Sequence, residues 1–473
     1  MTPRQASALT LAAVLPLLVP ASAAGARAKE PWPPIPKRGL FFTHYGEEHI
    51  DDADGIRILP RVVRDTARYR PDVVTMSADK ASDNSVENLS AWKQVMTPYD
   101  RRGIPYYAAV GNHDRSPEGT EGVGSAFGGG SIENYMQIFA DRPYPFGDGP
   151  PVRARGFAPT RRPATDPPGA STHYALEVGP ARFIFLDNSC FSFINCDPYQ
   201  NPPLGDGEGA ESQLDFMRSQ ALLANRSKQL AFVVMHMPTR DPRPGHTQPT
   251  PGPHTMGEGS SPENETFEDA AFASGIDGVF AGHIKGQWIY SAQNVGYFID
   301  GGAGGEVYVG PGEETGVDSG YWHGYRLASV RGSRIRTTDT VPVVSDAGIS
   351  LEGPTELETG SNARFNATAH QPTEEGPKVE LALRDPSEDA PNVRNLPTPA
   401  RIWTTSRRRV LRPIAAEKDD FRRDERTQTI SGRFHARCPG TARLTITSGW
   451  ERRSMRVQVR AGPAVPESCL RGG

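Results

Sequence analysis

The chain has 473 residues, of which 36% are hydrophobic and 23% are charged, and its formal net charge at pH 7 is −4. At about 150 residues per domain this length predicts about three units, or two if one of them is a large α/β core, and the composition excludes a multi-pass membrane protein. Because the two signs of charge nearly balance, no global basic field attracts nucleic acid or an anionic membrane, and we expect a small-molecule partner.

Residues 1–23 are typical of a secretory signal peptide. Arg4 provides the positive start, residues 8–20 are apolar and uncharged, and Ala21, Ser22 and Ala23 are small residues suited to cleavage. The apolar run is shorter than the ~20 residues that span a bilayer, so we expect no stable membrane insertion. The sequence therefore predicts a secreted protein, extracellular or periplasmic, whose mature chain begins with a proline-rich leader at residues 24–36.

The four cysteines fall into two local pairs. In an oxidising compartment they are expected to form disulfides, and four cysteines allow three connectivities. Proximity in sequence favours Cys190 with Cys196 and Cys438 with Cys469. Free buried thiols are the alternative, and they are less expected outside the cytosol.

Short apolar strands alternate with helical patterns over residues 37–341. This alternation predicts an α/β fold whose sheets are covered by helices. The expected strands are residues 39–42, 72–76, 104–110, 182–186, 230–235 and 278–281, and the expected helices are residues 58–69 and 88–96.

The pattern changes in residues 342–473. Ala442, Leu444 and Ile446 alternate with polar residues, as do Met455, Val457 and Val459, which is the period of strands with one buried face. With similar segments at residues 363–369 and 378–383, this pattern predicts a C-terminal all-β, Ig-like sandwich. The basic run 407–409 is interpreted as a solvated face, and polyanion binding is the weaker alternative.

Polar side chains follow four of the expected strands directly. Asp79 follows the second, Asn112 and His113 follow the third, His236 follows the strand at 230–235, and His283 follows the strand at 278–281. Each residue alone is more simply a surface histidine or a capping aspartate. Because open α/β sheets bind ligands at the carboxyl ends of their strands, four such positions together predict a site for a divalent transition metal, Zn, Mn or Fe.

The order of these motifs resembles the calcineurin-like metallophosphoesterase family, which includes purple acid phosphatases and cyclic-nucleotide phosphodiesterases. The resemblance covers about residues 37–340 and extends to framework segments at 173–187 and 297–305. It implies a layered β-sandwich flanked by helices and a small phosphate-ester substrate.

The resemblance also implies individual roles. Asp79 matches the bridging metal ligand, although the family's preceding glycine is Ala78 here. Asn112, His236 and His283 match the remaining ligands of the second metal. His113 matches the acid that protonates the leaving group, and Asp114 matches a carboxylate that orients it.

The departures from the family pattern fall on the first metal. Its Asp-x-His motif appears as Phe42-Thr43-His44, and the second histidine of the final Gly-His-x-His is Lys285. The resemblance therefore implies one tightly bound metal per chain. Lys285 is protonated at neutral pH and is predicted, with His44, to bind substrate instead. Alternatively, Lys285 faces solvent and His44 packs in the strand.

Glu47, Glu48 and His49 follow closely and offer replacement ligands for the missing first motif.

Two functional hypotheses follow. The first is a secreted phosphoesterase acting on a phosphate monoester or diester, in which a metal-activated water attacks phosphorus in line and His113 protonates the leaving oxygen. The second is a catalytically impaired relative that binds a phosphorylated or extracellular ligand on the same surface, with the sandwich as a docking surface.

Overall fold

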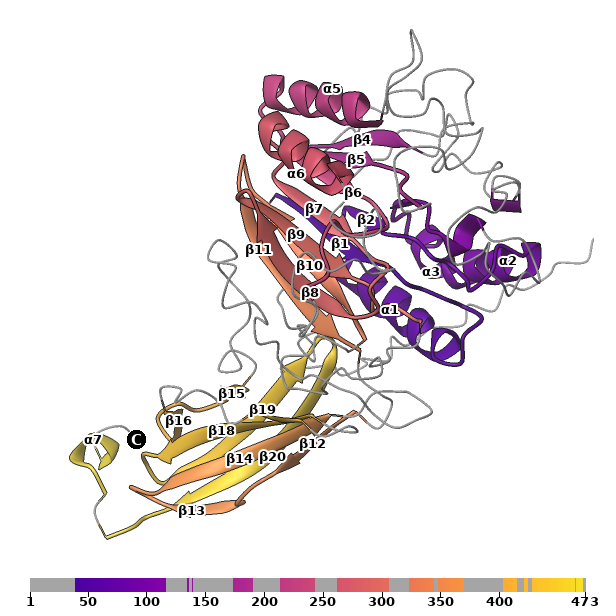
Figure 1. Cartoon of the computed structure of the whole chain (residues 1–473). Helices are drawn as coiled ribbons and strands as arrows, with labels where there is room; N and C mark the ends of the chain where they lie inside the picture. Colours follow the sequence, from indigo (N-terminus) through magenta and orange to yellow (C-terminus); the bar gives the residue numbers. More distant parts are fainter. Residues whose placement is uncertain are drawn as a thin grey trace, which may run out of the picture.

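The computed structural model describes most of the expected elements (Figure 1). The described residues are 39–115, 134–135, 138, 173–189, 213–242, 262–305, 323–343, 348–369, 403–414, 421–423, 428–463 and 465–470. The predicted signal peptide and leader, Cys190, Cys196, the strand expected at 378–383 and most of the long loops 116–130 and 238–264 lie outside these residues.

The N-terminal part contains two sheets. The first has the order β11-β10-β1-β2-β3, and its strands β1, β2 and β3 are parallel. Its strands are β1 (Leu40–Tyr45), β2 (Val73–Met76), β3 (Tyr106–Ala108), β10 (Gly324–Val330) and β11 (Ile335–Pro342). The second has the order β4-β5-β6-β7-β9-β8, with β5, β6, β7 and β9 parallel. Its strands are β4 (Tyr174–Val178), β5 (Ala181–Phe185), β6 (Leu230–Val234), β7 (Gly278–Ala281), β8 (Gln287–Ala292) and β9 (Val295–Asp300).

An aromatic core joins the two sheets. Phe42 of β1 contacts Phe183, Phe232 and Phe280 of the second sheet, with ring centroids 5.0, 5.7 and 5.5 Å away. All four rings are at most 1% exposed. A charged side chain in place of Phe42 would be buried among these aromatic rings at a high desolvation cost.

Helices cover the outer faces of both sheets (Figure 1). The helices beside the first sheet are α1 (Gly55–Tyr69), α2 (Val86–Val95) and the short α3 (Thr97–Asp100), and those beside the second are α5 (Gln213–Arg226) and α6 (Pro262–Ser274). Separate apolar cores lie under each group. At the start of α2, the Ser85 hydroxyl accepts a hydrogen bond from the Asn88 amide and so satisfies one of the free N–H groups of the first turn. The predicted α/β class is confirmed.

The boundaries of two strands differ from the sequence prediction by two residues or more. β1 continues through Tyr45 instead of ending at Phe42, because it pairs with β2 as far as Met76. β3 is shorter than expected and ends at Ala108. The extension of β1 places His44 inside a strand and moves the loop that follows to residues 46–49.

The C-terminal part is strand-rich, as predicted. One sheet has the order β12-β14-β18-β16, with β17 also paired to β18, and the other has the order β13-β20-β19-β15. The strands are β12 (Ile349–Glu352), β13 (Glu356–Glu358), β14 (Asn362–Ala369), β15 (Trp403–Thr405), β16 (Leu411–Pro413), β17 (Phe421–Arg423), β18 (Gln428–Ala436), β19 (Gly440–Ser448) and β20 (Glu451–Arg460). Phe365, Trp403, Phe434 and Leu444 belong to one shared core. Classification as Ig-like and the boundary at 341 stay predictions.

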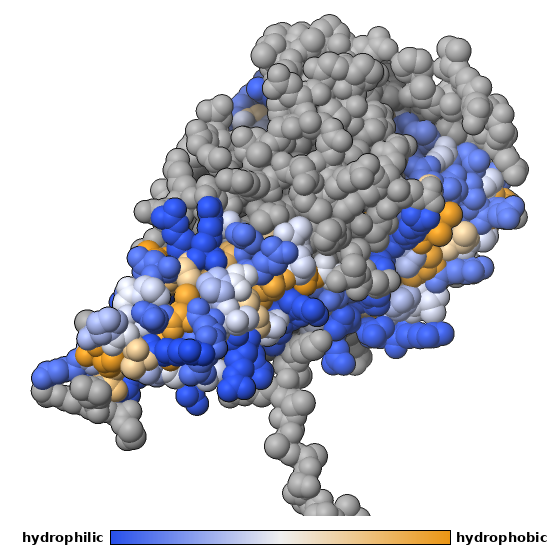
Figure 2. Space-filling model, turned by 90° about the horizontal axis from the view of Figure 1, so that it is seen from below, coloured by the Kyte–Doolittle hydropathy of each residue, from blue (hydrophilic) through white to orange (hydrophobic). Residues whose placement is uncertain are grey.

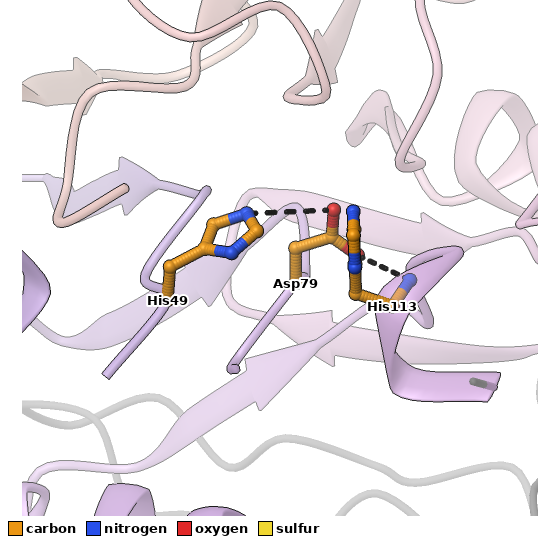
Figure 3. A group of neighbouring side chains, drawn as sticks. All are labelled: His49, Asp79 and His113. Carbon is orange, nitrogen blue, oxygen red and sulfur yellow. Dashed lines mark hydrogen bonds and ion pairs between the residues drawn. The ribbon is translucent and has the colours of Figure 1, made fainter. Parts of the chain in front are cut away.

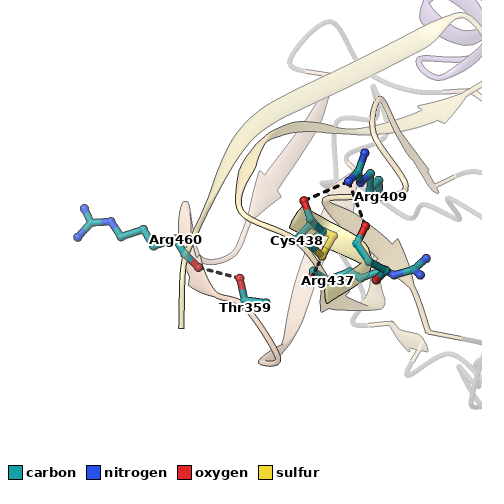
Figure 4. The surroundings of a disulfide bond; sticks show 7 residues. Thr359, Arg409, Arg437, Cys438 and Arg460 are labelled. Atoms are coloured by element: carbon teal, nitrogen blue, oxygen red, sulfur yellow. Dashed lines mark hydrogen bonds between the residues drawn. A yellow bond between two sulfur atoms is a disulfide. The ribbon is translucent and has the colours of Figure 1, made fainter. Parts of the chain in front are cut away.

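The predicted pairing of Cys438 with Cys469 is confirmed by a disulfide (Figure 4). It ties the short helix α7 (Glu467–Leu470) to the end of β18. The Arg409 guanidinium donates to the carbonyl oxygens of Ser468 and Cys469, at 3.0 and 3.1 Å. The disulfide therefore holds α7 against the C-terminal sheets.

The turn between β19 and β20 contacts the N-terminal part. The Trp450 indole donates a hydrogen bond to the Asp65 carbonyl at 2.9 Å, and its ring lies 4.9 Å from that of Tyr69 in α1. The Arg68 guanidinium lies over the same indole. On the described surface seen from below, small hydrophobic patches are interspersed among hydrophilic residues (Figure 2). Among the described residues, no helix is long and apolar enough to cross a bilayer.

Candidate metal centre

Loops that follow the parallel strands bring the predicted ligands together. Asp79 follows β2, Asn112 follows β3, His236 follows β6 and His283 follows β7. Asp79, Asn112 and His236 are at most 2% exposed. The carboxyl ends of strands from both sheets therefore collect side chains that lie up to 204 positions apart in the sequence.

The imidazole of His236 lies at the centre of this group. Its Nδ1 lies 2.8 Å from the carbonyl oxygen of Ser77 and donates its proton there, so Nε2 is the ring nitrogen that faces the cluster. Nε2 lies 2.8 Å from Asn112 Oδ1, 3.2 Å from His283 Nδ1 and 3.3 Å from Asp79 Oδ2. Four donor atoms of the types that bind a transition metal therefore converge.

Asp79 and His236 shift each other's pKa in the directions expected for an ion pair. Burial alone would raise the pKa of the Asp79 carboxyl, but His236 and His113 hold it well below its usual range. Burial alone would lower the pKa of His236, but the Asp79 carboxylate raises it to about 9. The Asp79 carboxylate is therefore ionised, and it provides the negative charge around which the site is organised.

These residues fit a divalent cation. Asp79, His236 and His283 offer ligand atoms that all lie within 4.8 Å of one another. Asp79 Oδ2 is buried and accepts no hydrogen bond that meets the geometric criteria within the described part of the chain, and the imidazoles of His236 and His49 lie 3.3 and 3.8 Å from it. A cation bound there would balance the charge of this buried carboxylate. The backbone carbonyl that fixes the His236 tautomer is a typical outer-shell partner of a metal-binding imidazole.

Comparison with known families decides the identity of this arrangement. The model of the calcineurin-like phosphoesterases matches residues 42–286, which is more than half of the chain. The chain belongs to the calcineurin-like phosphoesterase family. The family is metal-dependent and acts on phosphate esters, in agreement with the predicted recognition and with the ligand set described above.

Solved structures align with parts of this chain at low sequence identity. Purple acid phosphatase PPD1 from yellow lupin (Lupinus luteus) seeds is 13% identical, with a TM-score of 0.42, and the match covers 71% of this chain and 52% of the lupin protein. GAP50, described as the anchor in the inner membrane complex of Plasmodium, is also 13% identical, with a TM-score of 0.38 and coverage of 65% and 85%. The chain thus spans about half the length of the lupin phosphatase. A search of curated protein sequences found no significant match.

Backbone strain is concentrated at the metal centre. Among the described residues, nine non-glycine residues have positive φ, and five of them lie here: Glu47, His49, Ala78, Asp79 and His283. Ala78, at φ 88°, replaces the family's glycine in a conformation that disfavours a Cβ atom. Strain of about 1–3 kcal/mol at such a residue persists only where surrounding contacts enforce it, which is typical of functional sites.

Gly111 is required by close packing. A Cβ atom at this position would lie 2.0 Å from Asp79 Oδ1 and 2.7 Å from the Asp79 nitrogen. The absence of a side chain lets the loop after β3 approach Asp79, and the His113 amide then donates a hydrogen bond of 3.0 Å to Asp79 Oδ1 (Figure 3).

His113 lies at the rim and is partly exposed, as an acid that meets substrate should be. Its Nδ1 lies 2.7 Å from the carbonyl oxygen of Ser82 and donates there. The structure therefore orients His113 through Ser82 and not through Asp114, which corrects the sequence prediction for Asp114. The role of His113 in proton transfer stays a prediction.

Asp114 instead closes the loop after β3. Its carboxylate accepts hydrogen bonds from the Gly111 amide at 2.9 Å, the Lys80 amide at 3.1 Å and the Lys80 ammonium at 3.0 Å. Lys80 is 1% exposed, and its ammonium also faces the rings of Trp92 and Tyr135. Sequence reasoning missed this buried ion pair, because a lysine in the loop after a strand resembles a surface residue.

His44 is fully buried between the sheets, 5.1 Å from the Phe280 ring, and its Nδ1 lies 3.0 Å from the Thr75 hydroxyl. Burial and the charge of Arg326 lower its pKa to about 3, so the imidazole is neutral. The prediction that His44 binds substrate therefore has no support from its position, and the alternative of a packed strand residue describes it.

Lys285, by contrast, is 21% exposed at its side chain, and its ammonium lies 3.9 Å from Asp52 Oδ2. The side chain thus turns toward the loop before α1. Its predicted role in binding phosphate stays a prediction.

Glu48 is a buried carboxyl group, 0% exposed, and neither oxygen has a hydrogen-bond partner among the described residues. Burial raises its pKa well above the usual value of 4.5, although Lys80 opposes this. The unfolded chain therefore releases this proton first as pH rises, so stability falls with increasing pH above about 4.5.

We expect Glu48→Gln to remove this loss of stability. The variant should melt at the same temperature as the parent near pH 4, and its melting temperature should exceed the parent's increasingly between pH 5 and 8. Thermal unfolding followed by circular dichroism over this range measures the difference. A variant less stable than the parent at pH 8 would contradict the assignment of Glu48 as an uncompensated buried acid.

Proposed function

We propose that this protein is an exported, metal-dependent phosphoesterase that hydrolyses a phosphate monoester or diester. A single tightly bound divalent cation, Zn, Mn or Fe, is held by Asp79, Asn112, His236 and His283. The observation that carries the proposal is the convergence of Asp79 Oδ2, Asn112 Oδ1 and His283 Nδ1 within 3.3 Å of His236 Nε2. A cation bound there would act as a Lewis acid toward a phosphoryl oxygen and would lower the pKa of a coordinated water.

His113 supplies the proton for the leaving group in this proposal. Its Nδ1–H donates to the Ser82 carbonyl, which fixes the ring and directs Nε2 away from that contact. Oδ1 of the adjacent Asp79 carboxylate accepts a hydrogen bond from the His113 amide, which holds the backbone of His113 beside the candidate metal site. A protonated His113 then gives its Nε2 proton to the leaving oxygen, and Lys285 attracts the phosphate as a point charge.

Hydrolysis of p-nitrophenyl phosphate and bis(p-nitrophenyl) phosphate by the purified chain, supplemented in turn with Zn²⁺, Mn²⁺ and Fe²⁺, tests the proposal. We expect at least one metal to support turnover, and His113→Gln to lower kcat by about 10²–10⁴-fold without changing metal content. His435→Gln, on the outer face of β18, is the matched control and should retain full activity.

A chain that binds metal but hydrolyses neither ester would favour the alternative, a catalytically impaired protein that binds a phosphorylated or extracellular ligand. Export is tested separately by N-terminal sequencing of the protein secreted from an expressing host. We expect the mature chain to begin near Ala24.

A further inference from the structure

Three consecutive polar residues follow β5 and lie between two of the loops that carry candidate metal ligands. They are Asp187, Asn188 and Ser189, and each is 0% exposed. None of them belongs to the candidate ligand set. Because burial of polar side chains is costly unless they form hydrogen bonds, the partners of these residues show what the segment does.

The side chain of Asn188 is bonded to the backbone that carries His236. Its Oδ1 accepts hydrogen bonds from the amides of His236 and Met237, both at 3.0 Å, and its Nδ2 donates to the Met237 carbonyl at 2.9 Å. Just before this point, β5 and β6 are joined through their main chains, where the Leu186 amide donates to the Val234 carbonyl at 2.9 Å. The Asn188 carboxamide thus continues the pairing of the two strands beyond their ends.

The same segment also holds the loop after β3, through the buried side chain of Arg115. The Arg115 Nη2 atom donates to Asp187 Oδ2 at 2.6 Å, and its Nε donates to the Ser189 hydroxyl. That hydroxyl donates in turn to Asp187 Oδ1 at 2.6 Å. The Arg115 amide donates to the Asn112 carbonyl at 3.2 Å, so this ion pair is fixed to the loop that carries the Asn112 ligand.

The backbone of the segment is anchored to α5. Gln213, in the first turn of that helix, donates from Nε2 to the Asp187 carbonyl at 2.7 Å and accepts the Asp187 amide at Oε1, also at 2.7 Å. Gln213 is 1% exposed. A helix on the outer face of the second sheet therefore fixes the segment independently of either ligand loop.

A connection of this kind is needed because the ligands come from two sheets. Asn112 follows β3 of the first sheet and His236 follows β6 of the second, and the described strands of these sheets form no hydrogen-bonded pair with one another. The distance of 2.8 Å between Asn112 Oδ1 and His236 Nε2 therefore depends on contacts between loops and not on strand register. Residues 187–189 are bonded to both of these loops.

We propose that residues 187–189 position His236 and Asn112 relative to one another, and that Asn188 is the positioning residue for His236. The inference rests on the proposed function, because it requires a cation held by these ligands. Asn188 acts on that cation only through the backbone of His236. Outer partners that orient a metal ligand typically account for about 10–100-fold in affinity.

Titration of the metal-free, full-length chain with Co²⁺, followed by visible absorption, tests the proposal. Asn188→Leu keeps a side chain of similar size but removes the hydrogen bonds to His236 and Met237. We expect this variant to bind Co²⁺ about 10–100-fold more weakly than the unmodified chain. Its absorption bands should also change, because they depend on how the ligands are arranged around the ion.

Gln229→Leu is the matched control. Gln229 also bonds to the backbone through its carboxamide, donating to the Gly179 carbonyl at 2.7 Å, but it lies at the opposite ends of β5 and β6. This variant should keep the Co²⁺ affinity and the spectrum of the unmodified chain. Circular dichroism at the temperature of the titration shows whether each variant is folded.

Ser189→Ala provides a milder change in case Asn188→Leu does not fold. It removes only the hydroxyl that connects Arg115 to Asp187, and we expect a smaller loss of Co²⁺ affinity. Unchanged affinity in folded Asn188→Leu, or in Ser189→Ala if the leucine variant is unfolded, would overturn this inference and leave the proposed function standing. An equal loss in Gln229→Leu would also overturn it. Failure of the unmodified chain to bind Co²⁺ would overturn the proposed metal site, and this inference with it.

Discussion

Replacement of His236 by alanine is expected to remove the tightly bound cation and to lower any phosphoesterase rate by more than about 100-fold. Loss of an outer partner of a metal ligand already costs about 10–100-fold in affinity or activity, and His236 is itself the ligand around which Asp79, Asn112 and His283 converge. Competition with a chromophoric chelator measures the affinity, and elemental analysis after desalting measures retention.

Two controls make this result specific. His435→Ala removes an exposed imidazole of the C-terminal part and should retain the metal, while circular dichroism shows whether His236→Ala remains folded. A folded His236→Ala protein that retains one ion at full affinity would contradict the four-ligand site. Because His236 has a pKa of about 9 in the metal-free protein, a cation must displace its proton, so affinity should rise by up to about tenfold per pH unit below pH 9.

Asp114→Ala is expected to destabilise the protein by about 3–5 kcal/mol, because it leaves the buried Lys80 ammonium without its carboxylate. The same change removes the acceptor for the Gly111 amide and so loosens the loop that carries Asn112 and His113. Chemical denaturation of the metal-free protein measures the free energy of unfolding.

A double-mutant cycle separates this structural role from a catalytic one. Lys80→Met alone leaves a buried carboxylate, whereas Lys80→Met combined with Asp114→Leu removes both charges and should recover part of the lost stability. If Asp114→Asn instead kept full stability and shifted the pH dependence of kcat, Asp114 would act on His113 as the sequence pattern predicts.

The sequence alone determined the elements that depend on local pattern. The apolar run before His236 and the one before His283 are strands because short β-branched and aromatic runs favour extended backbone. The rule that parallel strands collect ligands at their carboxyl ends then brought Asp79, Asn112, His236 and His283 together in the prediction. The alternating segments around Leu444 and Val457 likewise predicted a strand-rich C-terminal part.

Only the tertiary structure decided which partner each polar group has. Asp114 could contact His113, its neighbour in sequence, but it pairs with Lys80, which lies 34 positions away. Glu47 Oε1 accepts the amide of His283 across 236 positions. Such contacts depend on how strand ends from distant parts of the chain pack side by side, and burial then makes each unpaired charge costly enough to select a single arrangement. Local patterns fix which side chains reach the site, while packing fixes what each of them touches.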